Sequence, residues 1–363
     1  MPLKKIVFVI PNLKLGGAER ALTTLANCLA SDGLIVSIIT FDHGHSFYAL
    51  DKSISIVPLN TTTKGFFGSL NVIKGTPKYI KSIRKIKPDI VISFMDYPNV
   101  ICILWNFIAK QKLIIAQRTD PVFGILPYGF RSLRKLLYKK AHAISLQTER
   151  SLKIFEHIKI KLPKIKSIIP NPLNKDCYDD NVLTTKENVI LTAGRLSPEK
   201  QFNLLIDIFS KTDHKDWQLW IAGSGPEMAA LQNQVNNLKL SKNIKLLGAQ
   251  KNIKQFYQRS KIFALTSRTE GYPNALCEAM ANGCACISFD CDTGPSEIII
   301  NNINGLLIEN GNVIEFQKQL QSLITDDNKI ASLSFEALKI RKSLNIKNIT
   351  EQWYALMNIV INN

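Results

Sequence analysis

The chain has 363 residues, of which 45% are hydrophobic and 21% are charged. This composition excludes a disordered chain, a collagen-like repeat and a small disulfide-stapled protein, and the length predicts two domains. Lys and Arg exceed Asp and Glu by 46 − 29 = 17. Residues 1–180 hold 27 basic and 12 acidic side chains, a net charge of +15, whereas residues 181–363 hold 19 and 17, a net charge of +2. The basic first half indicates a polyanionic partner or an anionic membrane surface.

The cysteines and the apolar runs of the sequence indicate the cellular compartment of the protein. The seven cysteines are too few and too irregularly spaced for a disulfide framework, and no two pairs have zinc-ribbon spacing. The first apolar run, Lys4–Pro11, stops at proline and lacks the long apolar core of a signal peptide. Nowhere do about 18 apolar residues follow one another, as a membrane span requires. Cys284 and Cys286 stand in a small-residue, apolar stretch, where we expect buried, reduced thiols. We therefore expect a cytoplasmic protein that can rest on a membrane.

Short apolar runs alternate with helical segments along the first half. The runs are typical of buried strands, and the segments between them have apolar residues at helical spacing. Continuous apolar strands separated by helices indicate a parallel sheet covered on both faces, which is an α/β fold. The expected strands are Ile6–Ile10, Val36–Thr40, Ile54–Pro58, Asp89–Phe94, Leu113–Ala116 and Ala143–Leu146, and helices include Ala18–Ser31, Pro77–Ile86 and Ser132–Lys140.

Two prolines interrupt this pattern at Ile168–Asn174, where they favour an extended linker. A second alternating series follows, and the tail Ile346–Ile361 is one more helix. We therefore predict two Rossmann-like domains, residues 1–170 and 171–340, and a C-terminal helical segment, residues 341–363. The second series has expected strands at Val189–Ala193, Gln218–Ala222, Ile244–Leu247, Ile262–Leu265 and Ala285–Phe289, and helices at Phe202–Phe209, Glu227–Leu238, Ile253–Arg259 and Asn274–Asn282.

Three glycine-containing turns follow expected strands. Gly16-Gly17 precedes the first helix, and Gly223-Ser224-Gly225 lacks the third glycine of a dinucleotide-binding turn. Gly194 opens the sequence Gly-Arg-Leu-Ser-Pro-Glu-Lys at the start of another helix. Arg195 and Lys200 would flank the crevice at the carboxyl ends of the strands, where ligands bind in open α/β sheets. Two cations beside a helix N-terminus suit a diphosphate, although solvated surface charges have the same pattern.

Two carboxylates stand eight residues apart in the most informative segment, Ser267–Ala281. Glu270 precedes a Gly-Tyr-Pro turn on the loop after an expected strand, and Glu278 faces inward from the following helix. A carboxylate accepts two vicinal hydroxyls, as a ribose or a hexose presents them. The helix start at Asn274 offers free N–H groups to a phosphate. A solvated surface acid would account for either carboxylate alone, but less readily for both in this setting.

These motifs, in this order and spacing, resemble the retaining glycosyltransferases of family 4, which have the GT-B fold. The resemblance rests on Gly-Gly-Ala-Glu-Arg, Gly-Arg-Leu-Ser-Pro-Glu-Lys, Gly-Ser-Gly-Pro and Glu-x7-Glu, and it spans about residues 6–350. It extends to bacterial members that elongate polyprenyl-diphosphate-linked saccharides for O-antigen, capsule or exopolysaccharide. Residues 117–121 resemble a Glu-Arg-Asn-Asp-Pro loop of that subgroup, from which Gln117 and Thr119 depart, and residues 289–299 resemble its phosphate-side loop.

The resemblance implies two domains that face a central cleft, with the C-terminal helix returning toward the first domain. Arg195 and Lys200 would hold the donor diphosphate, and Glu278 the nucleotide ribose. Glu270 would contact the transferred sugar. The remaining positions that the resemblance implies are Gly16, Gly17, Gly271, Tyr272, Pro273 and Asn274 on the donor side, and Arg118 and Asp120 on the acceptor side.

The resemblance also implies a UDP-sugar donor and catalysis without a cofactor or a divalent metal. No Asp-x-Asp motif stands where a metal would need it, so cations would stabilise the departing nucleoside diphosphate. The expected course is a front-side displacement with retention, in which the leaving diphosphate helps to deprotonate the acceptor hydroxyl. A double displacement through Glu270 is an alternative at this point. The transferred sugar and its linkage are also open.

The helix Phe130–Lys140 adds a prediction from helical geometry. At about 100° per residue its cationic side chains share one face and its leucines share the opposite face. We predict that the cationic face docks the diphosphate and neighbouring headgroups of a lipid-linked acceptor at the anionic inner face of the plasma membrane. An exposed cationic helix without a partner is the alternative. The cationic face comprises Arg131, Arg134, Lys135, Tyr138 and Lys139, and the apolar face Leu133, Leu136 and Leu137.

Two other classes of protein are open at this point. A UDP-sugar epimerase on the same fold would need acid and base groups in the cleft, but the five histidines form no cluster in the sequence. A non-enzymatic basic protein that binds nucleic acid or a membrane would not need the phosphate motifs of the second half. It would show a recognition helix or an aromatic and basic platform. We therefore expect an enzyme without a nucleic-acid partner.

Overall fold

The computed structural model describes residues 3–61, 74–122, 126, 129–178 and 185–363. The chain divides into two compact units. Unit 1 comprises Met1–Pro172 and Leu344–Asn363, and unit 2 comprises Leu173–Ser343. The predicted boundaries lie at residues 170 and 340, and the predicted tail is a third segment. In the structure the tail is an integral part of unit 1.

Unit 1 is built on one sheet, which has seven parallel strands in the order β3-β2-β1-β4-β5-β6-β7 within the described residues. The strand order reverses between β1 and β4. All residues of β4 are buried, as is typical of a strand covered by helices on both faces. The strands are β1 (Lys5–Ile10), β2 (Ile35–Thr40), β3 (Ser55–Pro58), β4 (Ile90–Phe94), β5 (Leu113–Ala116), β6 (Ala143–Leu146) and β7 (Ile165–Ile168).

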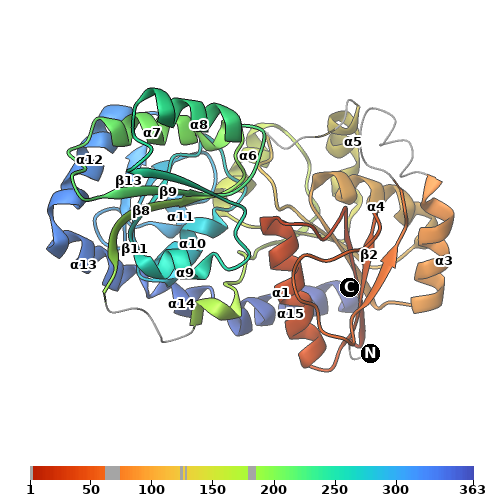
Figure 1. Ribbon diagram of the computed structural model, residues 1–363. Coiled ribbons are helices and arrows are strands. Elements are labelled where there is room, and N and C mark those ends of the chain that lie inside the picture. The colour runs from red at the N-terminus through yellow and green to blue at the C-terminus, as the bar shows by residue number, and fades with distance from the viewer. Residues whose placement is uncertain (1–2, 62–73, 123–125, 127–128, 179–184) are drawn as a thin grey trace. The chain divides into compact units, whose positions relative to one another are not determined.

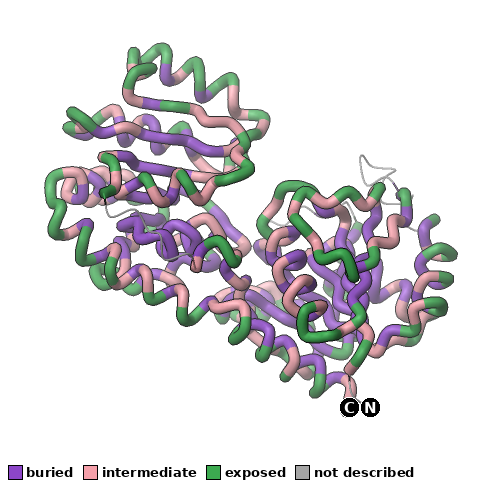
Figure 2. The backbone as a smooth tube through the Cα atoms, turned by 60° about the horizontal axis from the view of Figure 1, so that its bottom comes forward, coloured by how far each residue is buried: buried purple, intermediate pink, exposed green. Residues whose placement is uncertain are grey.

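The helices of unit 1 cover its sheet with their apolar faces. In α1, for example, Leu22, Leu25 and Leu29 recur at helical spacing and are fully buried. Figure 2 shows the same division, with buried residues along the strands and exposed residues on the outer faces of the helices. The helices are α1 (Gly17–Ser31), α3 (Thr76–Ile86), α4 (Asp96–Ala109), α5 (Phe130–Leu137), the short 3-10 helix η1 (Tyr138–Lys140), α6 (Glu149–His157) and α15 (Ile346–Asn362).

One strand of unit 1 lies where the sequence analysis expects the linker to begin. Ile168 ends β7 and pairs with Leu146 of β6. The sequence of this edge strand, Ile-Lys-Ser-Ile, has no continuous apolar run, and its residues are half-buried or exposed. This is why the pattern does not predict it. The edge strand of unit 2, β13 (Leu306–Glu309), is also absent from the predicted strands, although its Leu-Leu-Ile run is apolar and Leu306 and Ile308 are buried. The extended segment therefore begins after β7 and leads to the unit boundary.

The C-terminal helix α15 packs against α1 of unit 1 (Figure 1). Trp353 is 1% exposed and stacks on Phe94 at the end of β4, with ring centroids 6.0 Å apart. The guanidinium of Arg118 lies over the Trp353 ring, 5.4 Å from its centroid. The phenol of Tyr354 donates a hydrogen bond to Asp32 Oδ2 at 3.1 Å. The predicted return of the last helix to the first domain is confirmed.

Unit 2 repeats the architecture with six parallel strands in the order β10-β9-β8-β11-β12-β13 within its described residues. Its strands are β8 (Glu187–Ala193), β9 (Gln218–Ala222), β10 (Ile244–Gly248), β11 (Ser260–Leu265), β12 (Ala285–Asp290) and β13. Its helices are α7 (Phe202–Ser210), α8 (Met228–Asn237), α9 (Lys254–Arg259), α10 (Asn274–Ala281), α11 (Pro295–Ile298), α12 (Val313–Thr325), α13 (Asp327–Ala337) and α14 (Ile340–Ser343), with short 3-10 turns η2 (Lys175–Tyr178) and η3 (Pro198–Lys200).

The structure tests the predicted state of the cysteines and the predicted lack of a membrane span. All seven cysteines are free and six of them are buried, which confirms the prediction of unpaired, buried thiols. In the part of the chain that the structure describes, none of the helices combines the length and the apolar character that a membrane crossing needs.

Replacing Trp353 with alanine tests the attachment of α15 to unit 1. The substitution removes a fully buried ring from between α15, Phe94 and Arg118, so we expect the free energy of unfolding to fall by ~3–5 kcal/mol. Denaturant unfolding followed by circular dichroism measures the change. Ile359→Ala on the same helix is the matched control, because Ile359 is 49% exposed. An equal loss in both variants would mean that α15 is not anchored by its tryptophan.

Candidate active site

The strand order of unit 2 reverses at β8, which has β9 on one side and β11 on the other. In open α/β sheets, ligands bind outside the carboxyl ends of the strands at such a reversal. Residues 194–201 follow β8 and residues 266–273 follow β11. These two loops therefore form the candidate site of unit 2, and they contain Arg195, Lys200 and Glu270.

An ion pair joins the two loops. The Lys200 Nζ lies 2.6 Å from Glu270 Oε1, and the Ser267 hydroxyl donates a hydrogen bond to the same oxygen at 2.7 Å. The side chain of Lys200 is 20% exposed and that of Glu270 is 8% exposed, so the pair is largely shielded from water. The Thr293 hydroxyl bonds the backbone carbonyl of Glu270 from the loop after β12. Glu270 is therefore fixed at the sheet edge by contacts from two neighbouring loops.

The loop after β8 presents its cations around a short 3-10 turn. Arg195 is exposed, and Lys200 is the last residue of η3. The Ser197 hydroxyl donates to Glu199 Oε1 at 2.6 Å instead of capping the turn. Burial of Glu199 opposes ionisation, but this hydrogen bond and the charges of Lys200 and Arg195 hold its pKa below its usual range. The expected α-helical start is thus a tight turn, and α7 begins after it at Phe202.

Two glycines let neighbouring loops of unit 2 approach closely. At Gly223, where φ is +153°, a Cβ would overlap the carbonyl oxygen of Gly194. At Gly225 it would overlap the carbonyl oxygen of Leu196. The Leu196 amide also donates to the Ser224 carbonyl at 3.0 Å. The Gly-Ser-Gly motif is therefore a strand-to-helix turn that supports the loop of Lys200, and no dinucleotide-binding turn is needed to account for its glycines.

The turn between Glu270 and α10 is compact. Gly271 and Tyr272 are half-buried, Pro273 is buried, and the amide of Asn274 donates to the Tyr272 carbonyl at 2.9 Å. At Gly294, where φ is +103°, a Cβ would overlap the ring of Pro273, so the loop after β12 packs directly on this turn. The turn that connects Glu270 to α10 is therefore tightly packed.

Glu278 lies within α10 and is 5% exposed. The Tyr257 hydroxyl donates to its Oε2 at 3.2 Å. The structure thus brings Arg195, Lys200, Glu270 and the turn to the carboxyl end of one sheet, and Glu278 lies in the helix that follows the turn. Within the described ranges, no cluster of three or more His, Cys, Asp or Glu side chains is arranged to hold a metal ion.

Comparisons with known proteins match this architecture. Residues 178–339 match the family described as glycosyl transferases group 1. Over 99% of its length the chain is 30% identical to the whole of a Campylobacter jejuni protein named GalNAc-alpha-(1->4)-GalNAc-alpha-(1->3)-diNAcBac-PP-undecaprenol alpha-1,4-N-acetyl-D-galactosaminyltransferase. The chain belongs to the group 1 glycosyltransferases. Over 94% of its length it is also 26% identical to the amylovoran biosynthesis glycosyltransferase AmsD of Erwinia amylovora, of which it covers 96%.

Solved structures match the fold of this glycosyltransferase. Anabaena HepE in complex with UDP and glucose superposes with a TM-score of 0.83 at 19% identity, covering 98% of this chain and 99% of that one. TarM gives a TM-score of 0.80 at 15% identity over 98% and 99% of the two chains. At these identities the likeness concerns the fold alone. The GT-B fold that the motifs predict is thus confirmed.

In unit 1 of the glycosyltransferase, Gly16 and Gly17 stand at the start of α1. Gly16 is the N-cap residue, and its amide and carbonyl both bond the hydroxyl of Tyr48, at 3.3 and 3.1 Å. A Cβ at Gly16 would overlap the carboxylate of Glu19, which is 8% exposed. Burial raises the pKa of Glu19. The absence of a side chain at Gly16 therefore leaves room for a buried carboxylate to fold back over the first turn of the helix.

Arg118 is a structural residue of unit 1 in this structure. It is 6% exposed and lies between the rings of Phe94 and Trp353, 5.2 and 5.4 Å from their centroids. Its Nη1 donates to the Ile169 carbonyl at 2.8 Å and its Nη2 to Ser145 at 3.0 Å. The expectation that Arg118 meets the acceptor does not fit this burial, because its guanidinium is enclosed by aromatic rings and internal acceptors.

Asp120 follows in the same loop and is 6% exposed. Its Oδ1 accepts a hydrogen bond from the amide of Val122 at 2.7 Å, which is an Asx turn. The carboxylate therefore shapes the loop, and an acceptor contact by Asp120 stays a prediction.

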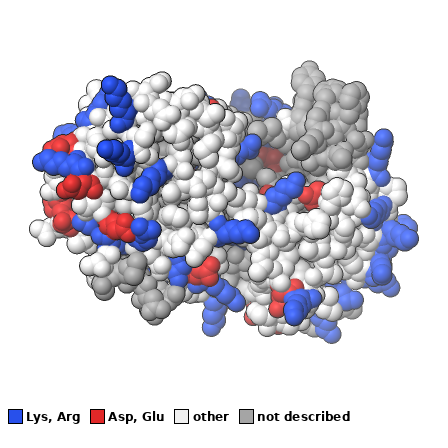
Figure 3. All heavy atoms as spheres, viewed as in Figure 1, with Lys and Arg blue, Asp and Glu red and all other residues white. Residues whose placement is uncertain are grey.

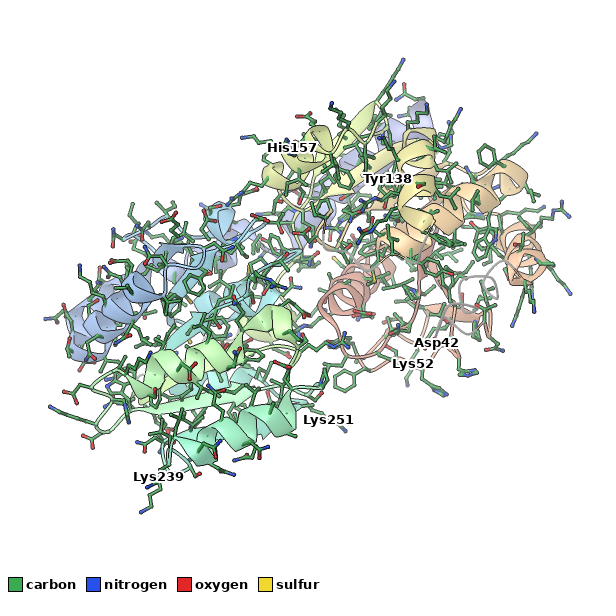
Figure 4. All side chains as sticks on the ribbon, turned by 90° about the horizontal axis from the view of Figure 1, so that it is seen from above. Asp42, Lys52, Tyr138, His157, Lys239 and Lys251 are labelled. Carbon is green, nitrogen blue, oxygen red and sulfur yellow. The ribbon has the colours of Figure 1, made fainter. Side chains whose placement is uncertain are left out.

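The helix α5 presents faces other than those that its sequence predicts. Arg131 and Lys135 are exposed, but Arg134 is 6% exposed, Tyr138 is fully buried, and Leu136 is 62% exposed. Tyr138, labelled in Figure 4, comes directly after α5. The predicted cationic docking face is therefore wrong for Arg134 and Tyr138. A buried partner turns that side of the helix inward.

That partner is Asp96, which the sequence analysis did not single out. Asp96 begins α4, with Met95 between it and the end of β4, and is 3% exposed. Its Oδ1 accepts from Tyr138 at 2.7 Å and from Arg134 at 3.1 Å, and its Oδ2 accepts from Gln117 and Thr119, each at 2.8 Å. Burial raises the pKa of Tyr138 well above its usual value, with Asp96 adding to the shift, so the phenol remains a donor. A buried carboxylate thus collects four donors.

This network gives a physical reason for the departure at position 117. The Gln117 amide donates to Asp96, whereas the glutamate of the resembling loop would place a second carboxylate there. We expect Gln117→Glu to lower the free energy of unfolding at neutral pH by ~3 kcal/mol, the size of an uncompensated buried charge. The loss should shrink as pH falls, because the repulsion raises the pKa of one carboxyl in the folded state, and its protonation then relieves the strain. Urea unfolding across pH measures this.

Two further variants sharpen the test. Gln255→Glu on α9 is the matched control, because Gln255 is exposed, and it should change stability little. The double variant Asp96→Asn with Gln117→Glu restores a single buried carboxylate and should recover part of the loss. A Gln117→Glu protein as stable as the wild type would contradict the network.

Proposed function

We propose that this glycosyltransferase moves a hexose or an N-acetylhexosamine from a UDP-sugar to a saccharide linked to undecaprenyl diphosphate, in the synthesis of a surface polysaccharide. The observation that carries the proposal is the Lys200–Glu270 ion pair, with Arg195 on the same loop, at the strand reversal of unit 2. The names of the Campylobacter and Erwinia relatives support the acceptor and the pathway class. The UDP and glucose bound to HepE support the donor class.

The donor site follows from the charges of unit 2. Lys200 and Arg195 hold the diphosphate, Glu278 accepts the ribose hydroxyls, and Glu270 contacts the sugar being transferred. Two cations can stabilise the charge that develops on the leaving diphosphate, which is the work that a divalent metal does in other enzymes. We therefore propose catalysis without a metal or another cofactor.

We propose that the transfer retains the configuration of the donor. The bond between the sugar C1 and the β-phosphate oxygen breaks, and the acceptor oxygen attacks C1 on the same face. The acceptor proton passes to the departing diphosphate. The Lys200–Glu270 pair favours this course over a covalent intermediate, because a carboxylate oxygen that accepts from Lys200 and Ser267 is a weaker nucleophile.

Lys200→Ala tests the diphosphate role. Losing one preorganised cation costs ~2.7–4 kcal/mol of transition-state stabilisation, so kcat should fall by about 10²–10³. Radiolabelled UDP-sugars and a synthetic N-acetylhexosaminyl polyprenyl diphosphate provide the assay. Lys251→Ala is the matched control, since Lys251 is exposed on unit 2 (Figure 4) and should leave kcat unchanged.

The same assay separates the alternatives. Transfer to lipid supports the proposal, interconversion of the UDP-sugar would identify an epimerase, and no reaction would leave a binding protein. Transfer should persist with EDTA, and loss that magnesium or manganese reverses would contradict metal-independent catalysis. The anomeric configuration of the product, read by NMR, tests retention.

We propose that unit 1 contacts the membrane at the carboxyl ends of α3 and α4. No acidic residue occurs between Asp51 and Asp89 or between Asp96 and Asp120. A hollow there is lined by Ile80, Ile83, Ile108 and Ala109, with Arg84 and Lys87 among the lining residues. Phe107 and Ile108 are 58% and 59% exposed. Figure 3 shows Lys and Arg side chains gathered over α3 at the right of that view.

An anionic bilayer is the partner that this surface fits. Apolar side chains enter the boundary between headgroups and acyl chains, and the surrounding cations pair with anionic headgroups. Elsewhere on unit 1, α5 exposes two further cations and one apolar side chain, Arg131, Lys135 and Leu136. We therefore propose peripheral association with the inner face of the plasma membrane, where the lipid-linked acceptor resides.

The double variant Arg84→Glu with Lys85→Glu tests the membrane surface. At ~1 kcal/mol per cation, losing two should weaken binding to vesicles of phosphatidylglycerol and phosphatidylcholine by about 30-fold, and added salt should reduce the difference. Co-sedimentation measures the binding. Lys242→Glu with Lys251→Glu makes the same charge change at exposed sites of unit 2 and should bind more tightly than the unit 1 variant. Equal binding by the two variants would contradict this placement.

A further inference from the structure

The carboxylate of Glu278 has a buried phenol as a partner. Tyr257, on α9, is 2% exposed, and its hydroxyl donates to Glu278 Oε2 at 3.2 Å. The Tyr257 ring also lies 5.9 Å from that of Phe263 on β11, which fixes its direction. The hydrogen bond is shielded from water, because both side chains are almost fully buried. Such a bond to a charged group is stronger than an exposed one.

A single ammonium holds the two helices that carry these residues. Lys186 Nζ donates to the backbone carbonyls of Tyr257, Ser260 and Asn282, each at 2.9 Å. Tyr257 and Ser260 belong to the end of α9 and its C-cap, and Asn282 is the C-cap of α10. Helix carboxyl ends carry a partial negative charge, so one cation between two of them is favourable. Lys186 therefore ties the ends of α9 and α10 to one point.

We propose that Tyr257 is a positioning residue for the nucleotide site, that its phenol holds the Glu278 carboxylate in the orientation that accepts the ribose hydroxyls, and that Lys186 fixes the helix ends that bring the two together. The proposal rests on the proposed function, in which Glu278 binds the ribose. A carboxylate already held by a buried donor loses little further freedom when the nucleotide binds. Preorganisation of this kind increases affinity and geometric selectivity.

Discrimination between ribose and deoxyribose reports on this orientation directly. A site built to bond a hydroxyl disfavours the analogue that lacks it, because a buried polar group is then left without its partner. The probes are UDP and 2′-deoxy-UDP, and the readout is the ratio of their inhibition constants against the transfer reaction. A tyrosine that merely supports the fold would change stability, or both constants together, without changing the ratio.

Tyr257→Phe removes only the hydroxyl. We expect the preference for UDP over 2′-deoxy-UDP to fall about tenfold, at the low end of what a hydrogen bond to a charged group contributes. The donor KM should rise while kcat changes little. Tyr354→Phe is the matched control, because the Tyr354 hydroxyl bonds Asp32 at the surface of unit 1, and it should leave the ratio unchanged.

Two more variants separate the possible failures. If Glu278→Gln abolishes the preference but Tyr257→Phe keeps it, the positioning role is wrong and the ribose contact stands. If Glu278→Gln keeps the preference, the ribose contact of the proposed function is wrong, and the inference fails with it. Lys186→Met keeps the phenol and the carboxylate but frees the helix ends, so it should also lower the ratio. An unchanged ratio in Lys186→Met would contradict the proposed role of Lys186. Thermal unfolding confirms that each variant is folded.

Discussion

The Lys200–Glu270 ion pair is the contact on which the candidate site of the glycosyltransferase depends. It joins the loops after β8 and β11, where the strand order of unit 2 reverses, and a buried carboxylate must keep a cation to remain stable. The surrounding features preserve this contact. Gly223 and Gly225 let the loop after β9 support the loop of Lys200, and the Thr293 hydroxyl bonds the carbonyl of Glu270. The site is therefore assembled before any nucleotide arrives.

Unit 1 also contains a buried carboxylate that is held by hydrogen-bond donors, but its role there is structural. Asp96 follows β4, next to the strand reversal of its own sheet. Two of its four donors, Gln117 and Thr119, come from the loop after β5, and the other two come from α5 and η1. One buried charge thereby orients the residues 117–120 and turns α5 onto the core. In unit 2 the buried carboxylate stays near the surface beside Lys200, where a ligand can compete for the cation. In unit 1 it is closed off, which favours a structural role.

The sequence predicted most strands of both sheets, because parallel strands are continuous apolar runs, and it predicted the motifs of unit 2, because these follow strands. It failed where partners are distant along the chain. Helical spacing shows that α5 has two faces, but only Asp96, 38 residues before Arg134, decides which face is buried. Arg118 matches the arginine of the family's Glu-Arg-Asn-Asp-Pro loop. Its guanidinium nevertheless lies over the Trp353 ring and donates to the Ile169 carbonyl, and both partners are distant along the chain. Asp96 itself could have been predicted, since it lies two residues after a buried strand. The roles of Arg195, Lys200, Glu270 and Glu278 stay predictions.

The affinity for UDP without its sugar tests the central claim most directly. In the free protein, Glu270 holds the ammonium that the diphosphate needs, so the carboxylate competes with the nucleotide and does not bind it. Calorimetry on Lys200→Ala should show UDP binding weakened about tenfold or more, as expected for the loss of a charged hydrogen bond. Glu270→Gln should bind UDP as tightly as the wild type or more tightly, although it transfers sugar poorly. Equal weakening of UDP binding in both variants would contradict the account.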